Sequence, residues 1–254
     1  MKSRSKFTWA GRLLGPGALL ALALVVGCAS KDVPISDYSA DQLWEQGVAA
    51  YNDEEWDEAV RFFDRYVLTG GSDPRVVQAR YYIGRAHFEK GQYVTAASTF
   101  SRLAGDLGRT AMADDARFMA CRAYEELSPR PQLDQEYTRA AIDHCRALVD
   151  HFPDSEFADP AREIVERMRG RLAHKLYTTG DWYVGRHAYD SALIYFEDVV
   201  EQYPDTEWAP KSLLKQYEIY GILQYEEEQD EVRDRLLRAY PDSEAAQQVQ
   251  NGSP

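Results

Sequence analysis

The chain has 254 residues, of which 44% are hydrophobic and 12% aromatic, and its formal net charge at pH 7 is −13. That composition is sufficient for a globular core or an extended repeat array and excludes a low-complexity chain. The acidic balance argues against nucleic-acid binding and against an electrostatic membrane patch, because both need a basic surface.

Residues 1–27 differ from the rest of the chain. Four basic residues precede an apolar run from Leu13 to Val26, which is broken only by Gly15-Pro16-Gly17. This run is too short and too rich in glycine for a membrane-spanning helix, and it predicts a secretory signal peptide over 1–27. Without that segment the chain carries 25 basic and 42 acidic residues, a net charge of −17.

The signal ends in Val25-Val26-Gly27-Cys28, which resembles a bacterial lipobox. The resemblance implies that Cys28 is lipidated, with acyl chains such as palmitate, and becomes the mature N-terminus. Ala29 in place of Asp implies sorting to the outer membrane, where more than one acyl chain gives stable anchoring. An ordinary signal peptide with an incidental cysteine, or a signal anchor, is the alternative. If Cys28 is lipidated, residues 28–39 form a tether.

An internal repeat follows. Three segments align without gaps on a glycine, an alanine twelve residues later and a phenylalanine four residues after that: Gly47, Ala59 and Phe63; Gly84, Ala96 and Phe100; Gly180, Ala192 and Phe196. A looser copy has Ala120, Ala141 and Cys145 at these places, with about nine extra residues in "ELSPRPQLDQE". A fifth copy ends in "LLRAYPDSE" and has Gln229 where a small residue is expected.

The spacing resembles the tetratricopeptide repeat, a helix–turn–helix unit of about 34 residues. Its small residues allow the two antiparallel helices of a unit to cross closely, and the aromatic residue fills the neighbouring space. We therefore predict an all-α fold, a right-handed superhelical solenoid of about five tetratricopeptide repeats. The expected boundaries are repeats one and two in 40–109, repeat three with its insertion in 110–159, repeats four and five in 160–244, and a disordered tail in 245–254.

The phrases "HFPDSE", "QYPDTE" and "AYPDSE" mark the seams between units. Proline ends one helix, and Ser155, Thr206 and Ser243 are expected to cap the next. One long helix, Pro160 to Thr179, is expected to run from the third seam into the fourth unit.

The usual signatures of catalysis and metal binding are absent from the sequence. It has no phosphate-binding glycine loop, no HExxH, no nucleophile elbow and no CxxC, so we expect no enzyme, no cofactor and no metal. His144, Cys145 and His151 lack an evident fourth ligand, and packed or surface histidines are the better interpretation. The acidic run Glu226–Glu231 is expected to be solvated charge at the turn inside unit five rather than a cation site.

Besides Cys28, the chain has only Cys121 and Cys145, on consecutive predicted helices. We expect two packed thiols, with a bridge as the alternative in a compartment that permits disulfides.

The first helix of each unit lines the concave face in repeats of this type. On that face the first three units place aromatic residues and two arginines, which are the side chains that binding hot spots prefer. The predicted binding groove consists of Trp44, Tyr51, Tyr81, Arg85, Phe88, Arg117 and Tyr124. The alternative for any single aromatic residue is packing between units.

The chain from about Cys28 to Tyr240 resembles the BamD family of outer-membrane lipoproteins of the β-barrel assembly machinery. The resemblance rests on the lipobox cysteine, the short tether, five units, the insertion in the third and the stretch Arg171–Thr206 in the fourth. It implies a non-enzymatic scaffold, lipid-anchored in the outer membrane and facing the periplasm. The implied partners are the periplasmic domains of a BamA-like barrel insertase and the C-terminal strands of unfolded outer-membrane clients, with other Bam lipoproteins as further candidates.

For docking of the insertase, units four and five suggest Tyr195, Glu197, Asp198 and Lys211. The family alignment leads us to expect a basic residue where Tyr195 stands, so an ion pair at that point is in doubt. The competing function is a repeat lipoprotein of the Tol-Pal or peptidoglycan-coordination type. The absence of a coiled-coil segment before the repeats argues against it.

Overall fold

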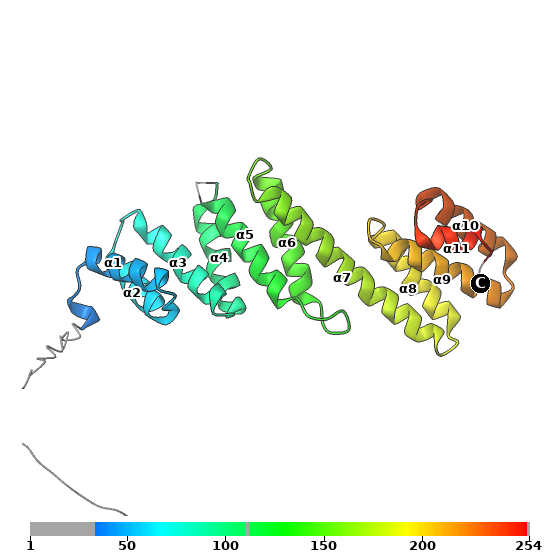
Figure 1. The fold of residues 1–254 in the computed structure, drawn as a ribbon, viewed down its shortest axis with the longest axis horizontal. Coiled ribbons are helices and arrows are strands. Elements are labelled where there is room, and N and C mark those ends of the chain that lie inside the picture. Colours follow the sequence, from blue (N-terminus) through cyan, green and yellow to red (C-terminus); the bar gives the residue numbers. More distant parts are fainter. Residues whose placement is uncertain (1–33, 110–111, 253–254) are drawn as a thin grey trace, which may run out of the picture. The chain divides into compact units, whose positions relative to one another are not determined.

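The computed structural model describes residues 34–109 and 112–252, and within these ranges it contains helices and no strands (Figure 1). A short 3₁₀-helix at Ile35–Asp37 precedes eleven α-helices. Their bounds are α1 Ala40–Asn52, α2 Trp56–Thr69, α3 Arg75–Glu89, α4 Tyr93–Leu107, α5 Ala113–Leu127, α6 Glu136–His151, α7 Ala158–Val184, α8 Tyr189–Gln202, α9 Trp208–Leu223, α10 Glu226–Ala239 and α11 Glu244–Gln250. The predicted signal peptide, the lipidation site Cys28 and the first part of the tether lie outside the described residues.

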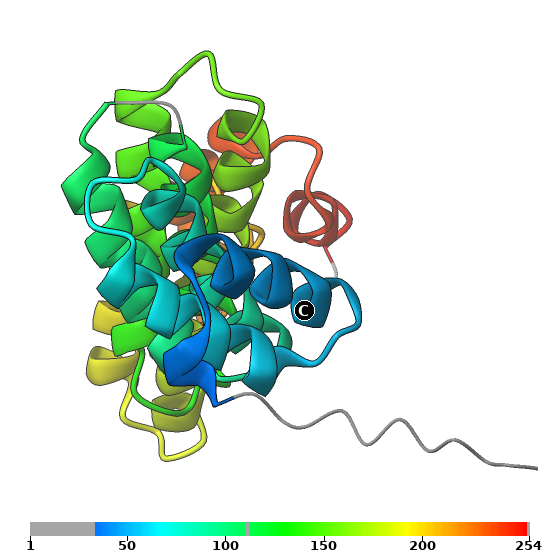
Figure 2. The same ribbon diagram turned by 90° about the vertical axis from the view of Figure 1, so that its left-hand side faces the viewer.

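Each helix from α1 to α10 packs against the next one in the chain (Figures 1 and 2). Alternate helices also touch, in the pairs α1 with α3, α3 with α5, α5 with α7 and α7 with α9. Five consecutive helix pairs therefore stack through their first helices, because each pair alone would leave an apolar face uncovered. The predicted all-α solenoid of tetratricopeptide type is confirmed.

The helix crossings depend on the glycines of the repeat. A Cβ atom added to Gly84 would lie 2.7 Å from the Phe100 ring, and the same contact would be 2.8 Å from Gly47 to Phe63 and from Gly180 to Phe196. All three phenylalanines are fully buried. The ring thus lies directly against the glycine of the partner helix, which explains why these two residue types recur together.

The three proline phrases form the same turn. In each one the backbone N–H of the Ser or Thr donates to the carbonyl of the aromatic residue three positions earlier, at 3.1 Å, in the pairs Ser155 to Phe152, Thr206 to Tyr203 and Ser243 to Tyr240. Of these three residues, only Ser243 caps a helix with its side chain, which accepts a hydrogen bond from the N–H of Ala246. The expectation of side-chain caps was wrong at the first two seams, because the turn continues for two residues after Ser155 before α7 begins and for one residue after Thr206 before α9 begins.

Helix α7 has 27 residues and includes the predicted Pro160–Thr179 helix. Pro160 is tolerated because it lies in the first turn, where backbone N–H groups have no partner within the helix. The acidic run Glu226–Glu231 is exposed, as expected, but it begins α10 instead of lying in a turn. Negative charge there is stabilised by the positive end of the helix dipole.

The end of the chain differs from expectation. Residues from Glu244 to Gln250 form α11, which packs against α9 and α10. Ala245, Ala246 and Val249 are buried in one cluster with Leu213 and Leu236. A helix with one apolar face covers the last repeat, as a capping element does in repeat proteins, so the predicted disorder of 245–254 was wrong for these residues.

Candidate functional site

A cluster around Arg85 joins the first helices of units one, two and three. The Tyr81 hydroxyl donates to Asp115 Oδ1 of α5 at 2.7 Å, and Arg85 Nη2 donates to Glu89 at 3.1 Å. Burial and the bond to Asp115 raise the pKa of Tyr81, and burial also raises the pKa of Tyr51, which lies in the electrostatic field of Arg85. Three of the predicted groove residues, Tyr51, Tyr81 and Arg85, are therefore brought together.

Two predicted aromatic residues of the groove are engaged in packing. The Trp44 ring lies 5.7 Å from Phe63 and 5.5 Å from Tyr66. Phe88 is only 7% exposed, and the Arg122 guanidinium covers its ring at 4.9 Å. Packing between helices, the alternative interpretation, therefore accounts for Phe88 and contributes at Trp44. The half-buried Tyr51 and Tyr81 also pack, on Tyr82 with centroids 4.8 Å apart and on Phe100 with centroids 5.5 Å apart.

Arg117 and Tyr124 have different surroundings from Arg85. Tyr124 stacks on His144 of α6 with ring centroids 4.8 Å apart, and the Arg117 guanidinium lies 6.0 Å from the Phe152 ring. Desolvation lowers the pKa of His144, and the nearby positive charge of Arg117 adds to that effect. Arg117 and Tyr124 thus contact α6 and the seam after it, whereas Arg85 lies near Tyr51 of α1. Tyr124 also packs against the cluster of Phe88, as Tyr81 does.

Both arginines retain hydrogen-bonding capacity. In the part of the chain that is described, Nε of Arg85 and Nε of Arg117 are buried without a hydrogen-bond partner. A buried donor without a partner costs free energy, and both nitrogens are enclosed by the protein.

A second ionic cluster at the start of the stack was missed in the sequence. Arg75 Nη2 donates to Asp73 at 2.7 Å and to Asp41 of α1 at 2.8 Å, and its guanidinium lies 5.7 Å from the rings of Trp44 and Tyr66. The hydrogen bonds from Arg75 hold the pKa of Asp73 well below its usual range. Asp41 and Arg75 are 34 residues apart, one repeat length, which is the signal that could have identified the pair.

The Asp73→Asn variant is expected to be less stable than the wild type at pH 7. A carboxylate whose folded-state pKa is depressed stabilises the fold above its unfolded pKa of about 3.9, and that contribution is lost as the pH falls through the folded-state pKa. The difference in urea midpoint between the two proteins should therefore shrink as the pH is lowered from 7 towards 2. A difference that is independent of pH would remove the ionic interaction from this account.

The predicted docking residues do not share one environment. Tyr195 stacks on Tyr183 of α7 with centroids 5.4 Å apart, whereas Glu197 accepts hydrogen bonds from Arg235 at 2.7 Å and from Gln216 at 3.0 Å. Asp198 accepts from the Gln202 side chain, and Lys211 pairs with Glu207 and lies 4.5 Å from the Trp208 ring. Glu197 thus belongs to a network that joins α8, α9 and α10.

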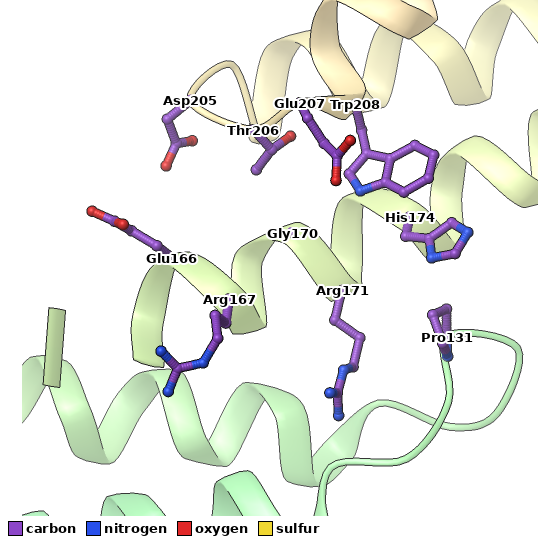
Figure 3. Close-up of a pocket in the computed structure, with 10 residues that line it drawn as sticks. All are labelled: Pro131, Glu166, Arg167, Gly170, Arg171, His174, Asp205, Thr206, Glu207 and Trp208. Carbon is purple, nitrogen blue, oxygen red and sulfur yellow. The ribbon is translucent and has the colours of Figure 1, made fainter. Parts of the chain in front are cut away.

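A pocket of about 670 Å³ lies along α7, between the insertion of unit three and the seam before α9 (Figure 3). Gly170 forms part of its wall, and the Trp208 ring stacks on His174 with centroids 4.1 Å apart. Arg171 Nη1 donates to the carbonyl of Ser128 at 2.7 Å. This pocket was not anticipated, although Arg167, Arg171 and His174 stand at helical spacing in the sequence.

The insertion of unit three is hydrogen-bonded both within itself and to α7. The fully buried Gln135 side chain donates to the carbonyls of Arg130 at 2.9 Å and of Leu133 at 3.1 Å. From α7, Lys175 Nζ also donates to the Leu133 carbonyl, at 2.7 Å. These bonds connect the insertion, which contributes Pro131 to the lining of the pocket, to α7.

Two further observations concern the described residues only. Among them, no group of three or more His, Cys, Asp or Glu side chains is arranged to hold a metal ion. None of the described helices is both long enough and apolar enough to cross a membrane.

Comparisons with known proteins find relatives over most of the chain. A relative from Vibrio cholerae named outer membrane protein assembly factor BamD is 28% identical over 222 residues, covering 81% of this chain and 89% of the relative. A protein of the same name from Caulobacter vibrioides is 25% identical over 215 residues, covering 83% of this chain and 70% of the relative. Among solved structures, the TPR2AB domain of yeast Sti1 in complex with pHSP90 aligns with a TM-score of 0.41 at 15% identity, covering 82% of this chain and 80% of that one.

The matched region includes nearly the whole helical stack. The model of the YfiO family, described as outer membrane lipoprotein, matches residues 36–236, from the 3₁₀-helix into α10. The predicted resemblance to BamD is confirmed, and the chain belongs to this family of outer membrane lipoproteins.

Proposed function

We propose that this chain is a non-enzymatic scaffold of the β-barrel assembly machinery, lipid-anchored through Cys28 in the outer membrane and facing the periplasm. The observation that carries the proposal is the family match over 36–236, because it extends into the fifth helix pair instead of covering one generic repeat. The relatives are named outer membrane protein assembly factors, and these names support the same role for this chain.

The front half of the stack is proposed to bind clients, with Arg85 at the centre of the site. Bacterial barrel clients typically end in an aromatic residue with a free carboxylate. The rings of Tyr51 and Tyr81 can contact the aromatic residue, and Arg85 can bind the carboxylate with two hydrogen bonds. Burial lowers the pKa of Arg85, but the neighbouring Tyr81, Tyr51 and Glu89 outweigh it and raise that pKa overall. The guanidinium is charged at neutral pH, as arginine always is in proteins.

Replacing Arg85 and Arg117 together by Glu should weaken binding of a client C-terminal peptide at least about tenfold, or 1.4 kcal/mol. Their different surroundings lead us to expect most of the loss from Arg85→Glu alone. Fluorescence anisotropy with a labelled peptide would measure the affinity. A peptide with an amidated C-terminus should bind weakly to the wild type and show little further loss with the variant.

The matched control for this experiment is Arg80→Glu. Arg80 lies on the same helix, is exposed, and pairs with Asp106 of α4 at 3.3 Å. The Arg80→Glu substitution should leave the peptide affinity unchanged. Equal losses of peptide affinity for Arg80→Glu and Arg85→Glu would show that the effect comes from net charge alone. An unchanged affinity when Arg85 and Arg117 are both replaced by Glu would exclude both arginines from the site.

The rear half is proposed to dock on the periplasmic domains of a barrel insertase. Lys211→Glu should lower recovery of a large barrel protein in mild-detergent co-purification without lowering the urea midpoint, because its ion pair with Glu207 is exposed and such pairs stabilise little. Glu197→Ala should lower the urea midpoint, since it leaves Arg235 and the buried Gln216 without their partner. Recovery of Tol proteins or peptidoglycan synthases in place of the barrel would favour the competing function.

A further inference from the structure

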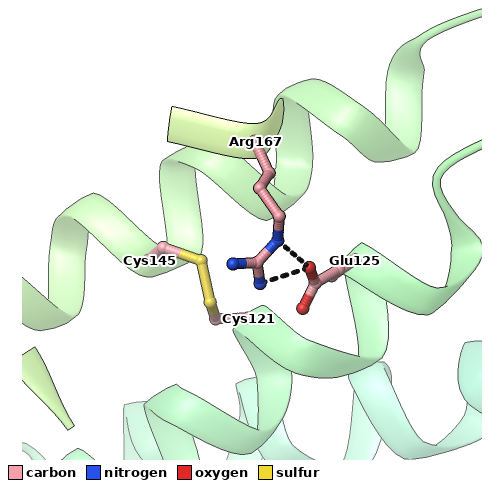
Figure 4. Close-up of a disulfide and its surroundings, with 4 residues drawn as sticks. All are labelled: Cys121, Glu125, Cys145 and Arg167. Carbon is pink, nitrogen blue, oxygen red and sulfur yellow. Dashed lines mark hydrogen bonds and ion pairs between the residues drawn. A yellow bond between two sulfur atoms is a disulfide. The ribbon is translucent and has the colours of Figure 1, made fainter. Parts of the chain in front are cut away.

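Cys121 of α5 and Cys145 of α6 form a disulfide, with their Cα atoms 5.0 Å apart (Figure 4). The expectation of two packed thiols was wrong, and the alternative of a bridge holds. Both residues are fully buried, in one cluster with Leu148 of α6 and Met168 of α7. Three helices therefore close over the two sulfur atoms.

The bond lies at the helix crossing of unit three. Cys145 follows Ala141 by four residues, which is the position of the phenylalanine in units one, two and four, and Ala120 has the place of the glycine. Unit three thus lacks the phenylalanine that the other units have at this position. The disulfide joins the same two helices at the level where the ring would lie.

The disulfide also adjoins the contact between units three and four. Glu125 lies one helical turn after Cys121 and accepts hydrogen bonds from Arg167 of α7, at 2.7 Å from Nη2 and 3.2 Å from Nε (Figure 4). The disulfide to α6 and the polar contact to α7 thus lie one helical turn apart on α5.

We propose that Cys121 and Cys145 are the modification site of a thiol-oxidising partner protein, which acts on the exported chain before α5, α6 and α7 pack together. Exchange needs in-line contact between a thiolate and a sulfur of the oxidant's own disulfide. A protein cannot make that contact with sulfur atoms enclosed by three helices. Oxidation therefore precedes closure of unit three, in a compartment where disulfides form.

The reaction balances as two exchanges. One cysteine thiolate attacks the oxidant's disulfide, forms a mixed disulfide and releases the oxidant's second sulfur as a thiolate. The other cysteine thiolate then attacks the mixed disulfide, forms the Cys121–Cys145 bond and releases the oxidant's first sulfur. The cysteines lose two electrons and the oxidant gains them, while the two thiol protons pass to the oxidant, which leaves as a dithiol.

Access to the bond can be measured by thiol trapping with a maleimide polymer, in a chain that carries Cys28→Ser so that only these two cysteines react. The untreated native protein should take up no label. With dithiothreitol the native protein should be reduced at least about a hundredfold more slowly than the same protein in 8 M urea, because the sulfur atoms are accessible only in an opened state. Labelling of the untreated native protein, or equal rates of reduction, would overturn the proposal.

A refolding experiment tests the order of events. The reduced, unfolded chain is diluted from urea, and a purified thiol oxidase is added either at once or after the helical signal has returned. Oxidation should be at least about tenfold slower in the second case; failure of the reduced chain to regain its helical signal before oxidation would also support the order. A reduced chain that refolds fully and is then oxidised as fast as the unfolded chain would contradict it. The Cys121→Ala/Cys145→Ala variant gives the baseline for labelling.

Discussion

The Gly84→Val variant is expected to unfold at a markedly lower urea concentration than the wild type, with a loss of about 3 kcal/mol in the free energy of unfolding. The new Cβ would lie 2.7 Å from the ring of the fully buried Phe100, and the methyl groups would require still more room. Closely packed helices cannot yield that room without separating α3 from α4. Replacing a glycine inside a helix stabilises the fold by about 1 kcal/mol at most, which is less than the expected cost of overpacking.

Gly105→Val is the matched control for this prediction. Gly105 lies on α4, the helix of Phe100, and has nothing within 4 Å of an added Cβ. Its effect should stay within about 0.5 kcal/mol. Phe100→Leu, which shortens the ring side chain, should offset part of the cost of Gly84→Val, with a coupling energy of about 1 kcal/mol or more in a double-mutant cycle. Additive effects would show that the Gly–Phe contact does not set the helix spacing.

The fold could be predicted because its main constraint is local. A unit needs a small residue at one position and a ring sixteen positions later, and Gly47 with Phe63, Gly84 with Phe100, and Gly180 with Phe196 all meet that need. Short-range steric rules of this kind leave a visible pattern in one sequence. The caps at Ser155 and Thr206 were predicted wrongly because the backbone turn, and not the identity of the side chain, decides where α7 and α9 begin.

The groove could be predicted only in part. Repeat positions indicate which residues of α3 and α5 lie on the same general face, but they do not determine which neighbour each side chain contacts. Arg85 remains near Tyr51, whereas Arg117 turns towards Phe152, and Phe88 is enclosed by α4 and α5. These outcomes depend on how each helix is rotated in the stack, which composition and spacing leave undetermined.

The repeat length also governs the polar contacts between units. Asp41 with Arg75 and Tyr81 with Asp115 are both 34 residues apart, which is one repeat. Glu125 with Arg167 spans 42 residues, because the insertion of unit three lengthens the interval. Equivalent faces of successive first helices are thus joined by polar pairs, and a search of the sequence at intervals of one repeat would find them.

The Cys121→Ala/Cys145→Ala variant should lose about 3 kcal/mol of stability. The bond closes a loop over a sequence separation of 24 residues, and in the chain-entropy account a loop of that size restricts the unfolded state by about this amount. The urea midpoint of the wild type should fall towards that of the variant when unfolding is measured in dithiothreitol. The midpoint of the variant should not respond to dithiothreitol.

If the disulfide takes the place of the aromatic ring in unit three, restoring the repeat motif should recover part of this loss. In the variant Ala120→Gly/Cys121→Ala/Cys145→Phe, the ring would pack on the new glycine as Phe100 packs on Gly84. A well-packed buried ring contributes several kcal/mol relative to alanine, so the urea midpoint should rise above that of the double alanine variant and be insensitive to dithiothreitol. The variant Cys121→Ala/Cys145→Phe, which keeps Ala120, is the control and should be less stable, because the alanine Cβ occupies the space that the ring needs. Equal midpoints for the two phenylalanine variants would show that unit three crosses at a wider spacing than the others, and that its disulfide does not stand in for the ring.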